Sequence, residues 1–191
     1  MSLNITITDK DLGLESKELN HPTIRMASRG IVINKDGKIA VMHKRLKNEY
    51  KLPGGGVEND EDMEITFQRE VLEETGCRVK IIECLGTIEE KRTQKNFKQT
   101  SYVYVARVTE DTNAFHLTKK EEEEQMELVW LDIEEALEKV SNCYPYLKPS
   151  SYGDIYYTKF AVARDRKILE YYKKMKKESN HDLSKIYQRK K

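Results

Sequence analysis

Short runs of alternating apolar and polar residues predict that strands make up much of the chain. Six stretches have this pattern: residues 4–8, 23–34, 39–42, 78–90, 100–108 and 126–131. Residues 35–38, Lys-Asp-Gly-Lys, separate the second and third stretches and predict a hairpin turn. We expect residues 4–8 to form an edge strand and the fourth stretch to break near Gly86.

The segment from Pro53 to Cys77 predicts a glycine loop, one helix and a stop. Three consecutive glycines after Pro53 allow the backbone to approach a ligand closely. Candidate caps for the start of the helix are Asn59, Asp60 and Asp62. Gly76 has the residue type that often ends a helix, so we expect a helix of about a dozen residues.

One face of this helix carries three carboxylates. Glu70, Glu73 and Glu74 fall within an arc of roughly 100°, because positions i, i+3 and i+4 share a face. Met63 and Phe67 lie on the same arc, so the acidic stripe is expected to face inward. Partly buried carboxylates that repel one another need a cation, and Mg²⁺ or Mn²⁺ prefers such oxygen ligands.

Composition narrows the class of protein. The 191 residues are 38% hydrophobic and 35% charged with a net charge of +1, which describes a very polar chain. No apolar run approaches the roughly 18 residues of a membrane span, and the N-terminus lacks a signal-type apolar core. Three cysteines, Cys77, Cys84 and Cys143, show no metal-binding or redox spacing. We therefore expect a cytoplasmic protein with no membrane partner.

The glycine loop and acidic helix together resemble the signature of the Nudix hydrolase family. That signature, the Nudix box, reads G-x5-E-x7-R-E-U-x-E-E-x-G-U, where U is a bulky apolar residue. The chain matches it without a gap from Gly55 to Cys77. The matching positions are Gly55, Glu61, Arg69, Glu70, Val71, Glu73, Glu74 and Gly76. Cys77 departs from the usual bulky residue at the last position, a difference that affects packing rather than chemistry.

The resemblance implies a MutT-like pyrophosphatase that hydrolyses a nucleoside diphosphate linked to another group, with Mg²⁺ or Mn²⁺ as cofactor. In the family, the glutamates that match Glu70, Glu73 and Glu74 bind the metal. The residue that matches Arg69 orients a glutamate through an ion pair, and the residue that matches Glu61 supports the site. A carbonyl from the loop, here Gly54 or Gly55, completes the metal shell. We expect water activated by the metal to attack phosphorus, with Glu70 or Glu124 accepting its proton.

Residues outside the box supply further candidates. Lys44 and Arg45 lie at a strand end that leads into the glycine loop and are candidate phosphate ligands, while Tyr50 is a candidate for stacking on a base. The acidic run 121–124 precedes the strand that contains Trp130. The resemblance implies that a glutamate of this loop reaches the site, and we select Glu124, with the other three as alternatives.

The remaining apolar patterns complete the expected fold. Residues 133–140, after the capping residue Asp132, and residues 154 to about 177 predict two more helices. We expect residues 1–153 to form an α/β (α+β) Nudix domain, an α/β/α sandwich around a mixed sheet. Residues 154–191 would form a C-terminal helix and basic tail that packs on or extends this domain.

Two alternatives to a nucleotide hydrolase stay open. From residue 159 to the end the chain has twelve basic and four acidic residues, which suits contact with RNA, as in a 5′ pyrophosphohydrolase. A sensing domain that binds a nucleotide without cleaving it is the other alternative, although such domains often lose box carboxylates and this chain keeps them. A homodimer is expected only by analogy with the family.

Overall fold

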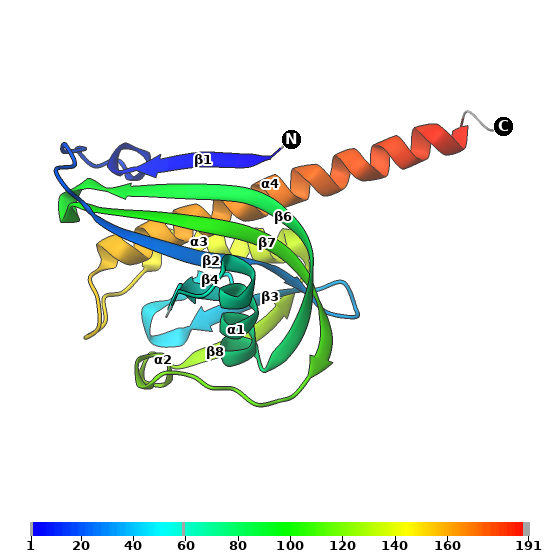
Figure 1. Ribbon diagram of the computed structural model, residues 1–191, viewed down its shortest axis with the longest axis horizontal. Coiled ribbons are helices and arrows are strands. Elements are labelled where there is room, and N and C mark those ends of the chain that lie inside the picture. Colours follow the sequence, from blue (N-terminus) through cyan, green and yellow to red (C-terminus); the bar gives the residue numbers. More distant parts are fainter. Residues whose placement is uncertain (1, 59, 189–191) are drawn as a thin grey trace.

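A mixed eight-stranded sheet forms the centre of the protein (Figure 1), whose computed structural model describes residues 2–58 and 60–188. The strands are β1 (Leu3–Thr8), β2 (Thr23–Ile33), β3 (Ile39–Lys44), β4 (Glu49–Lys51), β5 (Gly54–Gly56), β6 (Cys77–Arg92), β7 (Phe97–Asp111) and β8 (Met126–Leu131). The helices are α1 (Met63–Thr75), α2 (Lys119–Glu123), α3 (Ile133–Asn142) and α4 (Ile155–Gln188). Short 3₁₀ turns cover Asp9–Leu12, Arg45–Lys47, Thr93–Lys95 and Tyr144–Tyr146.

The order of the strands confirms a mixed sheet. It runs β1-β6-β7-β2-β3-β4, with β5 paired to β2 and β8 paired to β3. The β1/β6 and β2/β7 pairs are parallel, and the other pairs are antiparallel. As expected, β1 lies at an edge, and the register of β6 shifts next to Gly86.

The predicted hairpin is present, but its strands separate. Strands β2 and β3 pair only at Ile33 and Ile39, next to the turn. Farther along, β2 pairs with the glycine strand β5 at Ala27–Arg29, whereas β3 pairs with β8 and β4. The sheet therefore diverges at the level of β5, and this divergence places the glycines in its interior.

Helices cover both faces of the sheet, with α1 on one face and α3 and α4 on the other (Figure 1). The alternation of β2 explains the two cores, because Ile31 and Ile33 pack in the cluster with α3 and α4 whereas Val32 packs with α1. Phe67 of α1 and Phe160 of α4 are both fully buried. Burial of a large apolar side chain contributes about 1.5–3 kcal/mol, so these contacts hold both helices against the sheet.

The C-terminal helix α4 is longer than the predicted helix, which was expected to end near residue 177. Its first half packs through Phe160, Ile168 and Leu169, and its second half extends away from the rest of the protein (Figure 1). The side chains of residues 179–188 and all of residues 189–191 lie outside the described part, as does the candidate cap Asn59.

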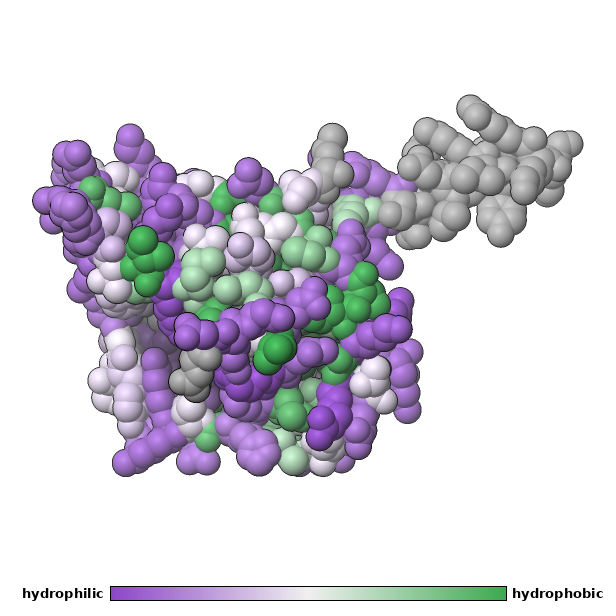
Figure 2. Space-filling view, viewed as in Figure 1, coloured by the Kyte–Doolittle hydropathy of each residue, from purple (hydrophilic) through white to green (hydrophobic). Residues whose placement is uncertain are grey.

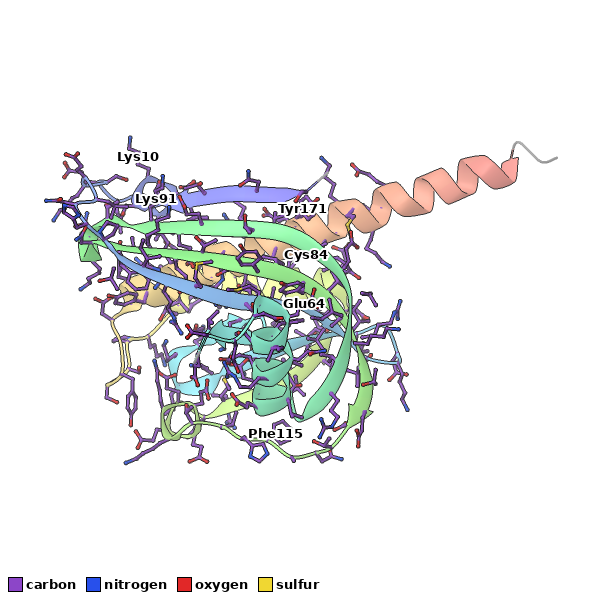
Figure 3. All side chains as sticks on the ribbon, viewed as in Figure 1. Lys10, Glu64, Cys84, Lys91, Phe115 and Tyr171 are labelled. Carbon is purple, nitrogen blue, oxygen red and sulfur yellow. The ribbon has the colours of Figure 1, made fainter. Side chains whose placement is uncertain are left out.

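The surface agrees with the polar composition, because hydrophilic residues cover most of the face in Figure 2. No helix in the described part of the chain has both the length and the apolar character of a membrane span. The three cysteines are free thiols; Cys77 and Cys143 are buried, and Cys84 is exposed on β6 (Figure 3).

Candidate active site

Helix α1 is held at both ends by the residues that the sequence suggested. The carboxylate of Asp62 accepts hydrogen bonds from the backbone N–H groups of Glu64 and Ile65, both at 2.8 Å. At the other end Gly76 has a φ of 67°, and its N–H donates to the carbonyl of Leu72 at 2.9 Å. These caps fix the helix at Met63–Thr75, and they thereby fix which side chains face the glycine strand.

The glycines of β5 are required because charged groups lie directly against them. A Cβ atom at Gly55 would lie 2.3 Å from Oε1 of Glu70. A Cβ atom at Gly56 would lie 2.4 Å from the guanidinium of Arg25. Gly54 has a φ of 133°, and its N–H donates to Oε2 of Glu74 at 2.9 Å. The glycine strand therefore separates an acidic side of the site, formed by α1, from a basic side.

Arg69 links the acidic residues of α1 to the loop. Its Nε donates to Oε1 of Glu61 at 2.9 Å, and its guanidinium also donates to the carbonyl of Gly56 at 3.1 Å. The same guanidinium contacts Glu70 and Glu73, each at 3.1 Å. The hydrogen bonds that Arg69 donates to Glu61 are the main reason that the pKa of Arg69 is raised. The structure thus forms the ion pair expected from the resemblance, whereas its role in catalysis stays a prediction.

The three glutamates of the acidic stripe differ in exposure. Glu74 is only 3% exposed and pairs with the Nζ of Lys51 at 2.5 Å. Glu70 is partly buried, and burial followed by the charge of Glu74 raises the pKa of Glu70. The side chain of Glu73 is 39% exposed. The expected inward stripe is therefore present, with one buried member and two that solvent can reach.

The acidic run before β8 forms the short helix α2 instead of a loop. Thr118 caps this helix and exchanges hydrogen bonds with Glu121 in a capping box. Glu121 lines the pocket beside α1, whereas Glu124 does not. Glu124 is 2% exposed, pairs with Lys44 at 2.8 Å and accepts a hydrogen bond from Ser150 at 2.6 Å. We therefore replace Glu124 with Glu121 as the candidate from this run.

The three predicted substrate ligands also lie in different surroundings. Lys44 lines the pocket, but its ammonium is paired with Glu124. Arg45 is exposed and outside the pocket lining. Tyr50 stacks on His43, with 4.1 Å between ring centroids, and packs against the core outside that lining. Of these three residues, only Lys44 stays a candidate for direct contact with a substrate.

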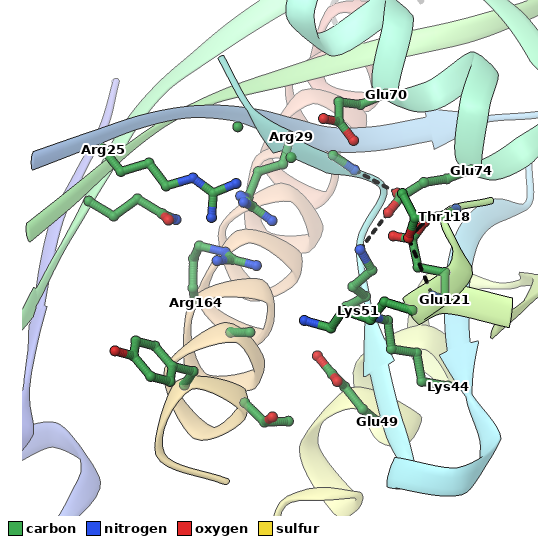
Figure 4. Close-up of a pocket in the computed structure, with 18 of the residues that line it drawn as sticks. Arg25, Arg29, Lys44, Glu49, Lys51, Glu70, Glu74, Thr118, Glu121 and Arg164 are labelled. Atoms are coloured by element: carbon green, nitrogen blue, oxygen red, sulfur yellow. Dashed lines mark hydrogen bonds and ion pairs between the residues drawn. The ribbon is translucent and has the colours of Figure 1, made fainter. Parts of the chain in front are cut away.

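A pocket of about 340 Å³ joins the acidic and basic sides (Figure 4). Its lining includes the predicted residues Gly54, Gly55, Arg69, Glu70, Glu73 and Glu74. It also includes Lys47 and Lys51, which belong to the same basic segment as Lys44 and Arg45 and were expected near the phosphates, and basic residues that sequence reasoning missed: Arg25, Arg29, Arg92, Lys120 and Arg164. These come from separate strands and helices, so no local motif could have identified them as a group.

The donor set suits a hard divalent cation, although the carboxylates are not gathered into a ready metal site. No three potential ligand side chains lie close enough to hold a metal among the described residues. Instead Glu74 forms an ion pair with Lys51, and Glu70 and Glu73 form ion pairs with Arg69. All these donors are oxygens. Burial, and then repulsion by Glu74, raises the pKa of Glu70, and a cation would relieve that repulsion. Metal binding at Glu70, Glu73 and Glu74 therefore requires these side chains to exchange basic partners for the ion.

Comparison with known proteins gives one family match and several relatives. The family described as "NUDIX domain" matches residues 23–149. A "MutT-like protein" of Streptomyces ambofaciens is 36% identical over 73 residues, which are 38% of this chain and 47% of that protein. "Diphosphoinositol polyphosphate phosphohydrolase 2" of Rattus norvegicus is 32% identical over 113 residues, which are 57% of this chain and 56% of that protein. The chain thus spans about half the length of these relatives.

Solved structures support the same fold. A NUDIX hydrolase from Nitrosomonas europaea superposes with a TM-score of 0.52 at 16% identity, and the match covers 68% of this chain and 83% of the other. At that identity the likeness concerns the fold alone.

Proposed function

Since this chain belongs to the Nudix family, we propose that it hydrolyses a diphosphate bond with the help of Mg²⁺ or Mn²⁺. The observation that carries the proposal is the pocket at the Nudix box. There Glu70, Glu73 and Glu74 of α1 share one cavity with Glu121. A diphosphate is a compact polyanion, and it requires both cationic neutralisation and an acceptor for a proton.

A bound divalent ion would neutralise the diphosphate and lower the pKa of the attacking water. The chain's own residues supply binding and orientation. Lys51 pairs with Glu74 inside the pocket. When Glu74 binds a metal instead, the ammonium of Lys51 can pair with a phosphate oxygen of the substrate. Arg69 fixes Glu70 and Glu73 relative to the glycine loop through its contact with Gly56.

Glu70 is the better candidate for the residue that accepts the proton from water. Its carboxylate lies against Gly55 and lines the pocket, so a molecule on the glycine loop would be within its reach. Glu124 has both oxygens engaged by Lys44 and Ser150. Glu121 lines the pocket but uses one carboxylate oxygen in the capping box. Geometry therefore supports Glu70 before either glutamate of the acidic run.

Two substrate classes fit the proposal. The Nudix box led us to expect a nucleoside diphosphate derivative. The printed name of the rat relative is that of a diphosphoinositol polyphosphate phosphohydrolase, and the charge of the pocket favours this second class. Fifteen lining residues are charged, and Tyr157 is the one aromatic residue in that lining, so the cavity offers little surface for a base to stack on.

The test is a panel of nucleoside diphosphate derivatives and diphosphoinositol polyphosphates, incubated with Mg²⁺ or Mn²⁺ and read out as phosphate release and product identity. We expect hydrolysis of at least one class, and loss of that activity on chelation. Glu73→Gln is the matched variant, because Glu73 is partly exposed and its loss should leave the fold intact. Tight binding of a nucleotide without turnover would instead favour the sensing alternative.

The RNA alternative has its own assay. Salt-dependent binding of 5′-diphosphorylated RNA, followed by release of phosphate from its 5′ end, would favour it over small substrates.

A further inference from the structure

Four arginines line the end of the pocket opposite α1, and we call them the arginine cluster. Arg25 and Arg29 come from β2, Arg92 ends β6, and Arg164 belongs to α4. Arg29, Arg92 and Arg164 are 5%, 6% and 3% exposed, respectively, whereas Arg25 is exposed at the rim. In Figure 4 the guanidinium groups of Arg25, Arg29 and Arg164 gather on one side of the pocket, across from Glu70 and Glu74.

The carboxylates inside this cluster do not balance its charge. Glu90 contacts Arg92 at 3.1 Å and Arg164 at 3.3 Å, and Asp165 contacts the Nε of Arg164 at 2.8 Å. Four guanidinium groups thus share two carboxylates. Among the described residues, no carboxylate lies within ion-pair distance of Arg25, and the buried Nε of Arg92 has no hydrogen-bond partner. Burial of unpaired donors is costly, so the cluster is built to accept further negative charge.

Electrostatics within the cluster support the same conclusion. Burial, and then the charge of Arg164, lowers the pKa of Arg29 to about 10. Burial, and then the charge of Arg92, lowers the pKa of Arg25 as well. Arg25 and Arg29 are therefore held near like charges, a condition that a bound anion would relieve, whereas Asp165 and Glu90 outweigh burial and raise the pKa of Arg164.

We propose that the arginine cluster binds a phosphate monoester on the part of the substrate that is not hydrolysed. This rests on the proposed function, because the diphosphate itself would lie at the Nudix box on the other side of the glycine strand. Guanidinium groups match phosphate oxygens through paired N–H donors, and several converging arginines select phosphate over an uncharged group. The substrate would thus carry at least one phosphate besides its diphosphate.

Helix α4 contributes to this subsite from outside the matched domain. The family match ends at residue 149, whereas Arg164, Thr158 and Ala161 of α4 line the pocket. Phe160 and Leu169 fix that face of the helix in the core. The segment beyond the matched domain therefore provides one wall of the pocket and one of the four arginines of the cluster.

The test is calorimetric binding of inositol hexakisphosphate, which carries phosphate monoesters but no diphosphate bond. A second arm compares adenosine 3′,5′-bisphosphate with AMP, which lacks the second phosphate. This arm tells whether the cluster binds a monoester carried by a nucleotide or one carried by a polyol. Ala161→Glu puts a negative charge on the wall formed by α4, and Ala161→Gln has nearly the same volume without the charge. Arg25→Gln removes a cluster charge that has no ion pair to break. Lys35→Gln removes one exposed charge in the turn between β2 and β3.

We expect Ala161→Glu and Arg25→Gln each to weaken binding of at least one probe by about tenfold or more, since one charge-assisted hydrogen bond contributes that much. Ala161→Gln changes no charge, and Lys35→Gln removes one that solvent screens, so both variants should stay within about twofold of the wild type. Absence of binding, or equal weakening by Glu and Gln at residue 161, would overturn the subsite even if the enzyme cleaves diphosphates. Binding that follows this pattern in a protein inactive on every diphosphate would support the subsite and refute the proposed hydrolysis.

Discussion

Glu74→Gln should abolish most turnover and also destabilise the fold, because this carboxylate has two partners inside the protein. Lys51 contacts one oxygen at 2.5 Å, and the N–H of Gly54 donates to the other at 2.9 Å. A glutamine carbonyl can still accept from Gly54. The ammonium of Lys51, whose side chain is 12% exposed, would lose its anionic partner. Neutralising one of three carboxylates that repel one another relieves repulsion, but the loss of the ion pair with Lys51 opposes that gain.

The loss of folding stability can be bounded from the contact between Lys51 and Glu74. A hydrogen bond to a charged group contributes roughly 1.5–3 kcal/mol, and removal of one partner from a fully buried pair costs about 3–5 kcal/mol. Since Lys51 retains some access to water, we expect about 2–3 kcal/mol for Glu74→Gln. In a chain of this length that lowers Tm by roughly 4–12 °C. Turnover should fall by about 100-fold or more, the effect of removing several kcal/mol of charge stabilisation at the metal.

A double-mutant cycle separates the two effects. Lys51→Met removes the ammonium, so the Glu74→Gln/Lys51→Met protein should recover stability to within about 1 kcal/mol of the wild type while staying inactive. Glu73→Gln, on an exposed side chain, should lose activity with a stability change below about 1 kcal/mol. Thermal denaturation and steady-state kinetics measure both quantities. Full activity of Glu74→Gln at saturating Mg²⁺ would refute the metal role, and unchanged Tm would refute the structural role of the pair.

Three further experiments, with four substitutions, test other parts of the site. Gly55→Ala should reduce kcat about tenfold or more, because the added Cβ would displace the carboxylate of Glu70. The circular dichroism spectrum should stay that of the wild type. Full activity would contradict the close approach of Glu70 to Gly55. Glu121→Gln should reduce turnover about tenfold, because Glu121 lines the pocket. Glu124→Gln should mainly lower Tm, because it leaves the buried Lys44 unpaired. The reverse result would restore Glu124 as the active glutamate. Burial would raise the pKa of Glu90, but two arginines outweigh burial and hold that pKa below 4.5. The wild type should therefore be more stable than Glu90→Gln at pH 7. Urea denaturation should show that this advantage is lost as pH falls below about 4.5.

The sequence was most informative where structure is local. Caps, glycines and glutamate spacing lie within residues 53–77, so backbone propensities and helix periodicity were enough to predict α1 with its acidic face. The hairpin turn at residues 35–38 and the break at Gly86 follow from the same local chemistry. By contrast, the separation of β2 from β3 depends on β5 pairing with β2, a contact between distant segments.

The choice within the acidic run shows why some of the site was beyond sequence reasoning. Thr118 and Glu121 have the spacing of a capping box, a signal that identifies the start of α2. Recognition of that box would have replaced the expected loop with a helix and separated Glu121 from Glu124. The pairing of Glu124 with Lys44 joins residues eighty positions apart, and no pattern along the chain indicates it.

Charge burial in this protein is concentrated at the pocket. Eleven charged residues of the described chain are buried, seven of them line the pocket, and three more pair with lining residues. Replacing buried ion pairs with apolar residues is often neutral or stabilising, so fold stability alone gives little reason to keep so many charges there. The charges that line the pocket, with carboxylates on α1 and arginines on β2, β6 and α4, instead match a ligand that needs a cation at one end and is itself anionic at the other. A diphosphate joined to a phosphate monoester has both properties, which links the box on α1 to the wall supplied by α4.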